Sequence, residues 1–177
     1  MRVIGGEFGS RRLKTLPGMA TRPTPDRLRE ALFDVLAPRI AGKVFLDAYA
    51  GSGAVGIEAL SRGAARVIFI EKSRAALRVL HENLAALGIE PRVTVIAGNA
   101  VTLLARHLPD MVFLDPPYQQ EGEYGAALKV LGDVAPGLVL VQHSARMPLP
   151  ETAGQLRRTR VLKQGDNCVT FFEVSLL

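Results

Sequence analysis

Short apolar runs alternate along this chain with segments in which apolar residues recur at helical spacing. The apolar runs predict buried strands at residues 43–47, 66–71, 92–96, 110–115 and 138–142. The helical spacing predicts helices at residues 54–62, 73–87, 100–106 and 122–133. Strands that alternate with helices in this way form a parallel sheet with right-handed crossovers.

The N-terminal part of the chain departs from this alternation. Residues 2–14 have no helical apolar stripe and predict a small β-hairpin or an extended arm. Thr24 is expected to cap the first helix, with Pro25 at the first helical position, because threonine caps and N-terminal prolines are common there. That helix should end at Pro38, since proline interrupts the helical hydrogen-bond ladder. We expect that removal of residues 1–14 leaves the fold intact.

Two β-rich runs, at residues 156–163 and 168–175, follow the last predicted helix, and Gly165-Asp166-Asn167 between them is typical of a hairpin turn. The predicted fold is α/β: a mostly parallel seven-stranded sheet with helices on both faces, an antiparallel C-terminal hairpin and a small N-terminal β-hairpin extension. At 177 residues the chain fits a single domain. Within it we distinguish a basic N-terminal arm, residues 1–20, from the body, residues 21–177.

Positive charge is concentrated in the N-terminal part. The sequence carries 22 Lys and Arg against 17 Asp and Glu, a formal net charge of +5, and residues 1–30 hold seven of the basic and three of the acidic ones. A basic arm on a nearly neutral body favours contact with a polyphosphate such as RNA. The candidate contacts are Arg2, Arg11, Arg12, Lys14, Arg22 and Arg27. A second basic cluster, which is either a further contact or a solvated face, comprises Arg157, Arg158, Arg160 and Lys163.

The composition excludes several classes of protein. The single cysteine, Cys168, rules out an internal disulfide and a cysteine metal cluster, and the histidines have no HxxxH spacing, so we expect no metal site. No apolar run approaches the roughly 20 residues that a membrane-spanning helix needs. Gly5-Gly6-Glu7 interrupts any secretory leader. We therefore expect a cytoplasmic monomer without a membrane partner.

A glycine-rich loop connects a predicted strand to a predicted helix at Asp47-Ala48-Tyr49-Ala50-Gly51-Ser52-Gly53-Ala54-Val55-Gly56. Gly51 and Gly53 permit a tight turn and close approach of a ligand to the backbone, next to a helix N-terminus with free N–H groups. With Gly56 they also complete a GxGxxG fingerprint, so the loop alone does not separate NAD from another nucleoside cofactor. Glu71 ends the next strand, where a carboxylate can bind a ribose diol, although a solvated acid is the simpler interpretation of this residue alone.

A second motif, Asp115-Pro116-Pro117-Tyr118, follows a later strand. Two prolines cannot continue a sheet ladder, so the strand stops and a rigid loop begins. Asp115 and the Pro116 carbonyl can accept two N–H bonds from an exocyclic amine, and Tyr118 can stack on the base. For the motif taken alone, an ordinary strand exit with a solvated Asp115 is the alternative. Its combination with Asp47 and Glu71 favours a methyl donor as cofactor.

With these motifs the chain resembles the Rossmann-like S-adenosylmethionine-dependent methyltransferases, in particular the bacterial small-subunit (16S) ribosomal RNA guanine-N2 methyltransferases of the RsmD type. The resemblance spans nearly the whole chain, and the basic N-terminal block is its family-specific part. It is carried by Arg2-Val3-Ile4-Gly5-Gly6, Arg12-Leu13, Arg22-Pro23-Thr24, Asp26-Arg27, Arg29-Glu30, Leu32-Phe33, the loop at 47–56, residues 58–62, Glu71, Asn83-Leu84, Asn99-Ala100, residues 115–118 and Gly165-Asp166. One departure is Gln142, where the fifth strand of the family usually ends in glutamate, which questions a charge-based role there.

The resemblance implies S-adenosylmethionine as cofactor and methylation of the N2 amine of a guanine in 16S ribosomal RNA, within an assembling or assembled small subunit whose proteins are further contacts. It implies that donor contacts come from Asp47, Gly51, Gly53, Glu71, Asn99 and Ala100. In this scheme Glu71 binds the ribose and Asn99 meets the adenine edge, although Asn99 also suits a helix cap. The acceptor base is held by Asp115, Pro116 and Tyr118.

Three other functions stay open at this level. An adenine-N6 methyltransferase of nucleic acid shares the chemistry of residues 115–118, and the shape of the pocket decides which purine enters. An NAD-dependent oxidoreductase is allowed by GxGxxG but leaves residues 115–118 unexplained and lacks a substrate domain. An RNA-binding module with a vestigial fold is disfavoured by the intact motifs.

Overall fold

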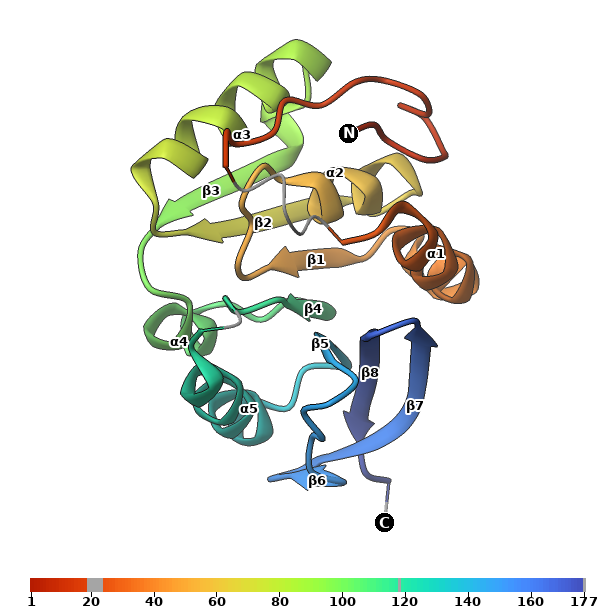
Figure 1. The fold of residues 1–177 in the computed structure, drawn as a ribbon, viewed down its shortest axis with the longest axis vertical. Helices are drawn as coiled ribbons and strands as arrows, with labels where there is room; N and C mark the ends of the chain where they lie inside the picture. Colours follow the sequence, from red (N-terminus) through yellow and green to blue (C-terminus); the bar gives the residue numbers. More distant parts are fainter. Residues whose placement is uncertain (19–23, 118, 177) are drawn as a thin grey trace.

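The structure, a computed structural model that describes residues 1–18, 24–117 and 119–176, contains one sheet of eight strands within those ranges. The strands are β1 (Val44–Asp47), β2 (Arg66–Glu71), β3 (Val93–Ala97), β4 (Met111–Leu114), β5 (Leu138–Ser144), β6 (Thr152–Ala153), β7 (Leu156–Gln164) and β8 (Asn167–Val174). Their order across the sheet is β3-β2-β1-β4-β5-β8-β7-β6 (Figure 1). The first five of these are parallel neighbours, and β8, β7 and β6 pair antiparallel. The α/β class and the antiparallel hairpin are confirmed, and the strand beyond the predicted seven is the two-residue β6, too short to leave an apolar pattern.

Helices cover both faces of the sheet (Figure 1). They are α1 (Asp26–Ile40), α2 (Ala54–Ser61), α3 (Arg74–Leu87), α4 (Ala100–Leu103) and α5 (Glu121–Val134). One core lies between the sheet and α1, α2 and α3, and a second core lies between the sheet and α4 and α5. Successive strand residues point to opposite cores, as the period of a strand requires: Phe45 belongs to the first core and Leu46 to the second. The strands are apolar on both sides because both sides are covered.

The start of α1 differs from the prediction. Pro25, and not Thr24, is the N-cap residue, and the helix begins at Asp26 without a side-chain cap among the described residues. The Thr24 hydroxyl instead donates a hydrogen bond of 2.7 Å to Oε1 of Gln142 on β5. Both side chains are buried, so a tertiary partner has taken the place of the local cap. The helix also runs two residues past Pro38 to Ile40, so the prediction that it ends at Pro38 is wrong.

Residues 1–14, the N-terminal segment, fold back on themselves and pack on the body. Within the described residues their pairing is a single antiparallel bridge between Arg2 and Arg12, with flanking hydrogen bonds from the Val3 N–H to the Arg11 carbonyl and from the Leu13 N–H to the Met1 carbonyl. The predicted hairpin is therefore present only as this short pairing. Val3 and Leu13 are buried in the first core, so the segment is part of the packed domain.

None of the described helices is long and apolar enough to cross a bilayer.

Candidate active site at the carboxyl edge of the sheet

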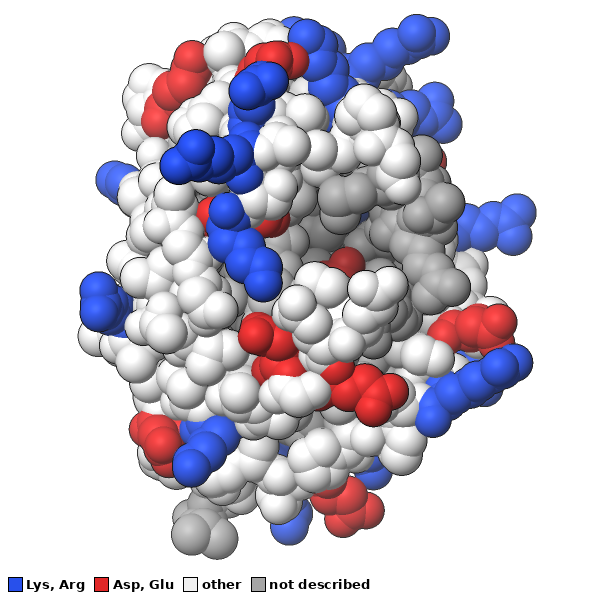
Figure 2. All heavy atoms as spheres, turned by 60° about the vertical axis from the view of Figure 1, so that its left-hand side comes forward, with Lys and Arg blue, Asp and Glu red and all other residues white. Residues whose placement is uncertain are grey.

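The two sequence motifs meet at one edge of the sheet. Since β1, β2 and β4 are parallel, Asp47 at the end of β1, Glu71 at the end of β2 and Asp115 directly after β4 all come to their common carboxyl edge. Asn99 follows β3 and reaches the same edge. Figure 2 looks toward this edge and shows a hollow with an acidic side chain at its floor.

The glycine loop is shaped by three glycines with different surroundings. Gly51 and Gly53 have positive φ angles of 56° and 88°, which other residues rarely adopt, and Gly53 is the N-cap of α2. A Cβ added at Gly51 would meet no atom within 4 Å, whereas one added at Gly53 would overlap Leu80 and one at Gly56 would overlap Phe69. Gly51 is therefore the glycine that leaves backbone open for a ligand, and the other two allow α2 to pack on the sheet.

Glu71 holds the glycine loop to the next helix. Its Oε2 accepts a hydrogen bond of 2.8 Å from the Gly51 N–H, and its Oε1 accepts one of 2.8 Å from the Ser73 N–H at the start of α3. A carboxylate can accept about four hydrogen bonds, so this partly buried group keeps capacity for ligand hydroxyls. The structural role of Glu71 was not visible in the sequence, where the residue suggested either a ribose contact or a solvated acid.

Asp47 and Asp115 form a pair of acids with perturbed protonation. Burial raises the pKa of Asp47 to about 7, opposed by a hydrogen bond of 3.1 Å from the Gly56 N–H and reinforced by the charge of Glu71. Burial also raises the pKa of Asp115 to about 7, and the charge of Asp47 adds to the shift. Asp47 is buried and Asp115 is partly buried, so both charges are poorly hydrated and lie close to other acids. Such pairs are characteristic of functional sites.

The loop after β4 is held by a tyrosine that the sequence did not indicate. The Tyr124 hydroxyl on α5 lies 3.4 Å from the Pro116 carbonyl oxygen and 3.1 Å from the Gln142 carbonyl oxygen. The shorter contact is to Gln142, and a carbonyl oxygen has two lone pairs, so the Pro116 carbonyl can still accept a bond from a ligand. Tyr118 lies outside the described residues, so its stacking role stays a prediction.

Asn99 and Ala100 stand where a helix begins. The Asn99 side chain accepts a hydrogen bond of 3.3 Å from the Thr102 N–H, so the residue is the N-cap of α4, as its alternative interpretation predicted. Its side chain is exposed and Ala100 is buried. A contact with the adenine edge stays a prediction for both residues.

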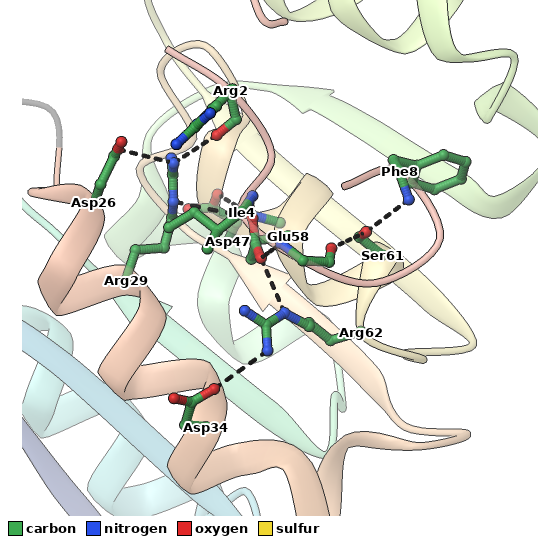
Figure 3. A network of polar contacts seen from close by, with 12 residues as sticks. Arg2, Ile4, Phe8, Asp26, Arg29, Asp34, Asp47, Glu58, Ser61 and Arg62 are labelled. Atoms are coloured by element: carbon green, nitrogen blue, oxygen red, sulfur yellow. Dashed lines mark hydrogen bonds and ion pairs between the residues drawn. The ribbon is translucent and has the colours of Figure 1, made fainter. Parts of the chain in front are cut away.

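Buried charges anchor the N-terminal segment beside this site. Glu58 on α2 is fully buried, and its carboxylate accepts hydrogen bonds of 2.8 and 3.0 Å from the N–H groups of Ile4 and Gly5 (Figure 3). Arg62 donates to the same carboxylate at 3.0 Å. Arg29 on α1, also fully buried, lies 4.0 Å from Glu58 and donates at 2.6 Å to the Arg2 carbonyl. Removing the segment would strip Glu58 of two donors, which argues against the expectation that residues 1–14 are separable.

The candidate RNA contacts divide into two groups. Arg11 and Lys14 are tied to α3: Arg11 donates to the Ala86 carbonyl at 3.0 Å, and the Lys14 ammonium pairs with Glu82 at 2.8 Å. Arg2, Arg12 and Arg27 have exposed side chains, and Arg22 lies outside the described residues.

A further set of basic residues follows the carboxyl end of β2. Lys72, Arg74 and Arg78, at the start and along the first turns of α3, are all exposed. Figure 2 shows basic side chains over the part of this face that carries α3 and the N-terminal segment, and acidic side chains below the hollow. In the sequence, the only indication of this basic surface was that the three residues follow Glu71 closely. The second cluster, residues 157–163, lies on β7, which β4, β5 and β8 separate from β1.

Among the described residues, no group of three or more His, Cys, Asp or Glu side chains could hold a metal ion. Cys168 is buried on β8.

The sequence matches a known family over nearly its full length. Residues 1–173 match the family model described as Conserved hypothetical protein 95. The chain is 36% identical over 169 residues to YlbH of Bacillus subtilis, a proposed rRNA methyltransferase, with 90% of this chain and 91% of that protein covered. It is 44% identical over 122 residues to ribosomal RNA small subunit methyltransferase D of Escherichia coli, with 68% of this chain and 61% of that protein covered.

The chain belongs to the RsmD-type methyltransferase family. Solved structures agree with this assignment. The proposed methyltransferase yhhF of Escherichia coli superposes with a TM-score of 0.86 at 35% identity, covering 98% of this chain and 97% of that one. A hypothetical protein of Thermus thermophilus superposes with a TM-score of 0.82 at 33% identity, covering 98% and 99%. The Rossmann-like methyltransferase fold implied by the resemblance is thereby confirmed.

Proposed function

We propose that this RsmD-type protein transfers the methyl group of S-adenosylmethionine to the exocyclic N2 amine of a guanine in small-subunit (16S) ribosomal RNA. One observation carries the proposal: Asp115 and the Pro116 carbonyl, two acceptors for an amine, adjoin the glycine loop and Glu71 at one sheet edge. The Escherichia coli relative is named as a small-subunit ribosomal RNA methyltransferase, which supports RNA as substrate. The activity would belong to a cytoplasmic monomer acting on small subunits or their assembly precursors.

The residues of the site fit this donor. The backbone at Gly51 is open, and Glu71 can bind ribose hydroxyls beside it. Asp47 and Glu71 place negative charge beside the loop, which suits the positively charged sulfonium and ammonium groups of the donor. When bound, S-adenosylmethionine supplies a methyl group already activated on sulfur. The remaining donor contacts would come from Asp47 and Gly53 at the amino-acid portion and from Asn99 and Ala100 at the adenine.

The chain's own residues would then prepare the acceptor. The guanine amine is a poor nucleophile because its lone pair is delocalised into the ring. N–H bonds to ionised Asp115 and to the Pro116 carbonyl would raise its electron density and aim it at the methyl carbon. As the carbon–nitrogen bond forms and the carbon–sulfur bond breaks, the amine must lose a proton. The Asp115 carboxylate, with a pKa raised to about 7, is suited to receive it near neutral pH.

RNA would be held by the basic surface around the hollow. Exposed Arg2, Arg12 and Arg27 would contact phosphates from the N-terminal side, and Lys72, Arg74 and Arg78 would extend this surface along α3. Such contacts position the substrate and make binding depend on salt.

The decisive experiment uses small ribosomal subunits from cells that lack this protein. The subunits are incubated with the enzyme and labelled S-adenosylmethionine, and the nucleosides are then separated. Label in N2-methylguanosine is the expected result, and label in N6-methyladenosine would instead support the adenine alternative. Asp115→Asn should abolish labelling, while Asp166→Asn, at the exposed β7–β8 turn, should not. No labelling of subunits, precursors or naked RNA by the intact enzyme would contradict the proposal.

A further inference from the structure

One buried side chain connects the N-terminal segment to the glycine loop. Asn83 on α3 is 2% exposed. Its Oδ1 accepts a hydrogen bond of 2.8 Å from the Lys14 N–H, and its Nδ2 donates at 3.0 Å to the Lys14 carbonyl. The same Nδ2 donates at 2.9 Å to the carbonyl of Ser52, which lies between Gly51 and Gly53. Both amide hydrogens are therefore used, one toward the segment and one toward the loop.

We propose that Asn83 is a positioning residue that links RNA binding on the N-terminal segment to donor binding at the glycine loop. The inference rests on the proposed function, because it takes S-adenosylmethionine and RNA as the two ligands. It assigns to Asn83 a task that neither motif contains: keeping the Ser52 carbonyl, and with it the Gly51 backbone, in one conformation.

The loop needs such a restraint because of its composition. Ser52 stands between two glycines with left-handed backbones, and glycine gives a loop many alternative conformations. The Glu71 carboxylate holds the loop at the Gly51 N–H, and Asn83 holds it at the next carbonyl. Without Asn83, donor binding would have to order the loop and would be weakened by the cost of that ordering.

The contact between Asn83 and the N-terminal segment is made through Lys14. Asn83 takes both backbone groups of Lys14, so a shift of the segment at this residue must move the amide that holds Ser52. The Lys14 ammonium also pairs with Glu82, the neighbour of Asn83 on α3. RNA that binds the exposed arginines of the segment would hold it in the docked position and thereby favour the ordered loop. Linkage is reciprocal, so bound donor would strengthen RNA binding by the same factor.

Equilibrium dialysis can measure this coupling. Labelled S-adenosylhomocysteine, which cannot react, is dialysed against the enzyme with and without saturating small subunits from cells that lack the protein. For the intact enzyme we expect subunits to tighten binding by about fivefold, the lower end of common coupling factors. Asn83→Ala should weaken binding without subunits, and its ratio of the two affinities should fall to one.

A matched control separates the effect of Asn83 from that of another side chain that contacts the segment. Ser61, at the end of α2, donates to the Gly5 carbonyl and accepts from the Phe8 N–H at 2.9 Å, but its hydrogen bonds do not reach the glycine loop. Ser61→Ala should therefore keep the coupling ratio, because Asn83 still joins Lys14 to Ser52. Asn83→Asp is the second test variant, because it can still accept from Lys14 but cannot donate to Ser52. Circular dichroism checks that each variant is folded.

The outcomes distinguish the two proposals. No binding of S-adenosylhomocysteine by the intact enzyme under either condition would overturn the proposed function. Binding with no effect of subunits would leave the function standing and overturn the inference. An unchanged ratio in folded Asn83→Ala or Asn83→Asp, or an equal loss of coupling in Ser61→Ala, would also overturn it.

Discussion

At the scale of single residues, the site contains two acids whose ionisation lowers the stability of the folded protein. Asp47 and Asp115 each have a pKa raised to about 7, with burial as the main cause. A protein that needed only stability would place neutral side chains there, because a carboxyl group that ionises in this setting opposes folding. The cost is understandable if the ionised form is needed when a cationic donor and an amine are bound. Stability and activity should therefore respond in opposite directions to removal of this charge.

Asp115→Asn should raise the stability of the ligand-free protein above pH 7. A folded-state pKa above the unfolded value means that the folded state binds more protons between pH about 4 and about 7, so the wild type loses stability as pH rises through this window. Asparagine has no charge to bury and should escape this loss. Urea unfolding at pH 8 and at pH 4 measures the difference, which should be large at pH 8 and vanish toward pH 4. An equal difference at both pH values would show that ionisation of Asp115 is not its cause.

Asp115→Ala should slow methyl transfer by at least about a hundredfold, the scale expected when an oriented polar contact in the transition state is lost. Donor affinity should change little, because the glycine loop and Glu71 stay in place. Single-turnover rates with saturating donor separate the two quantities. Asp166→Ala serves as the control for loss of an acid at an exposed position. Turnover of Asp115→Ala near the wild-type rate would remove Asp115 from the reaction centre.

At the scale of elements, the N-terminal segment and α2 behave as one structural unit. Glu58 on α2 accepts from the backbone of Ile4 and Gly5 and is flanked by Arg29 and Arg62, so the buried carboxylate is satisfied only when the segment is present. The glycine loop lies at the other end of the same helix. The segment therefore supports the loop and also carries positive charge. Deleting it would remove both contributions at once, so the deletion could not separate them.

Point substitutions test the charge without the support. The double variant Arg2→Ala with Arg12→Ala should fold normally, since the bonds that Arg2 and Arg12 supply to the segment come from the backbone. Its binding to subunits should weaken, and the slope of log affinity against log salt should become shallower by about 1.4 to 1.8 if both arginines contact phosphates. Filter binding over a salt series gives the slope. The control is the double variant Arg157→Ala with Arg160→Ala on β7. A change in slope only in that control would place the RNA at the β7 end of the sheet.

Packing of α2 on the sheet gives a second test at this scale. A Cβ at Gly56 would overlap the Phe69 ring, so Gly56→Ala should lower the free energy of unfolding by about 1–3 kcal/mol. Gly125→Ala on α5 introduces the same methyl group into open space, where lower backbone entropy of the unfolded chain should stabilise the protein by about 0.4–1 kcal/mol. Urea unfolding of both variants compares the signs. A stable Gly56→Ala would mean that α2 can shift away from β2.

At the scale of the whole molecule, the sheet order brings the site together. Asp47 and Asp115 lie 68 positions apart in the sequence, yet β1 and β4 are hydrogen-bonded neighbours, with Asp47 opposite Phe113. The reversal of strand order beside β1 separates the connections to β2 and to β4, and a ligand can enter between them. Several cofactors that contain a nucleoside bind in such a crevice, so the arrangement of the sheet does not by itself identify the cofactor.

S-adenosylmethionine and S-adenosylhomocysteine should raise the thermal midpoint, and NAD should not. Ligand at about 100 times its dissociation constant adds about 2.7 kcal/mol, which corresponds to about 5 to 10 °C for a domain of this size. Differential scanning calorimetry with each ligand makes the comparison. Stabilisation by NAD alone would instead support the alternative function of an NAD-dependent oxidoreductase.

The elements and the motif residues could be predicted from the sequence alone. Apolar period, glycines and prolines are local signals, so the strand ends at Asp47 and Glu71 and the end of α3 at Leu87 could be predicted closely. The class of fold and the family also followed, because the motifs are contiguous. Local rules failed at Thr24, where a distant partner, Gln142, replaced the expected helix cap.

The roles of the charged and polar residues outside the motifs depend on tertiary contacts. Glu58, Arg29 and Asn83 are polar residues in helices, and from sequence they would be expected to face solvent. Their burial depends on the N-terminal segment, whose backbone groups reach them across 27 to 69 positions of the chain. A hydrogen bond over such a distance is set by which strands and helices become neighbours, and no local pattern carries that information. For the same physical reason the raised pKa values of Asp47 and Asp115 could not be read from the sequence, because they depend on packing at the sheet edge and on the charge of a neighbouring acid.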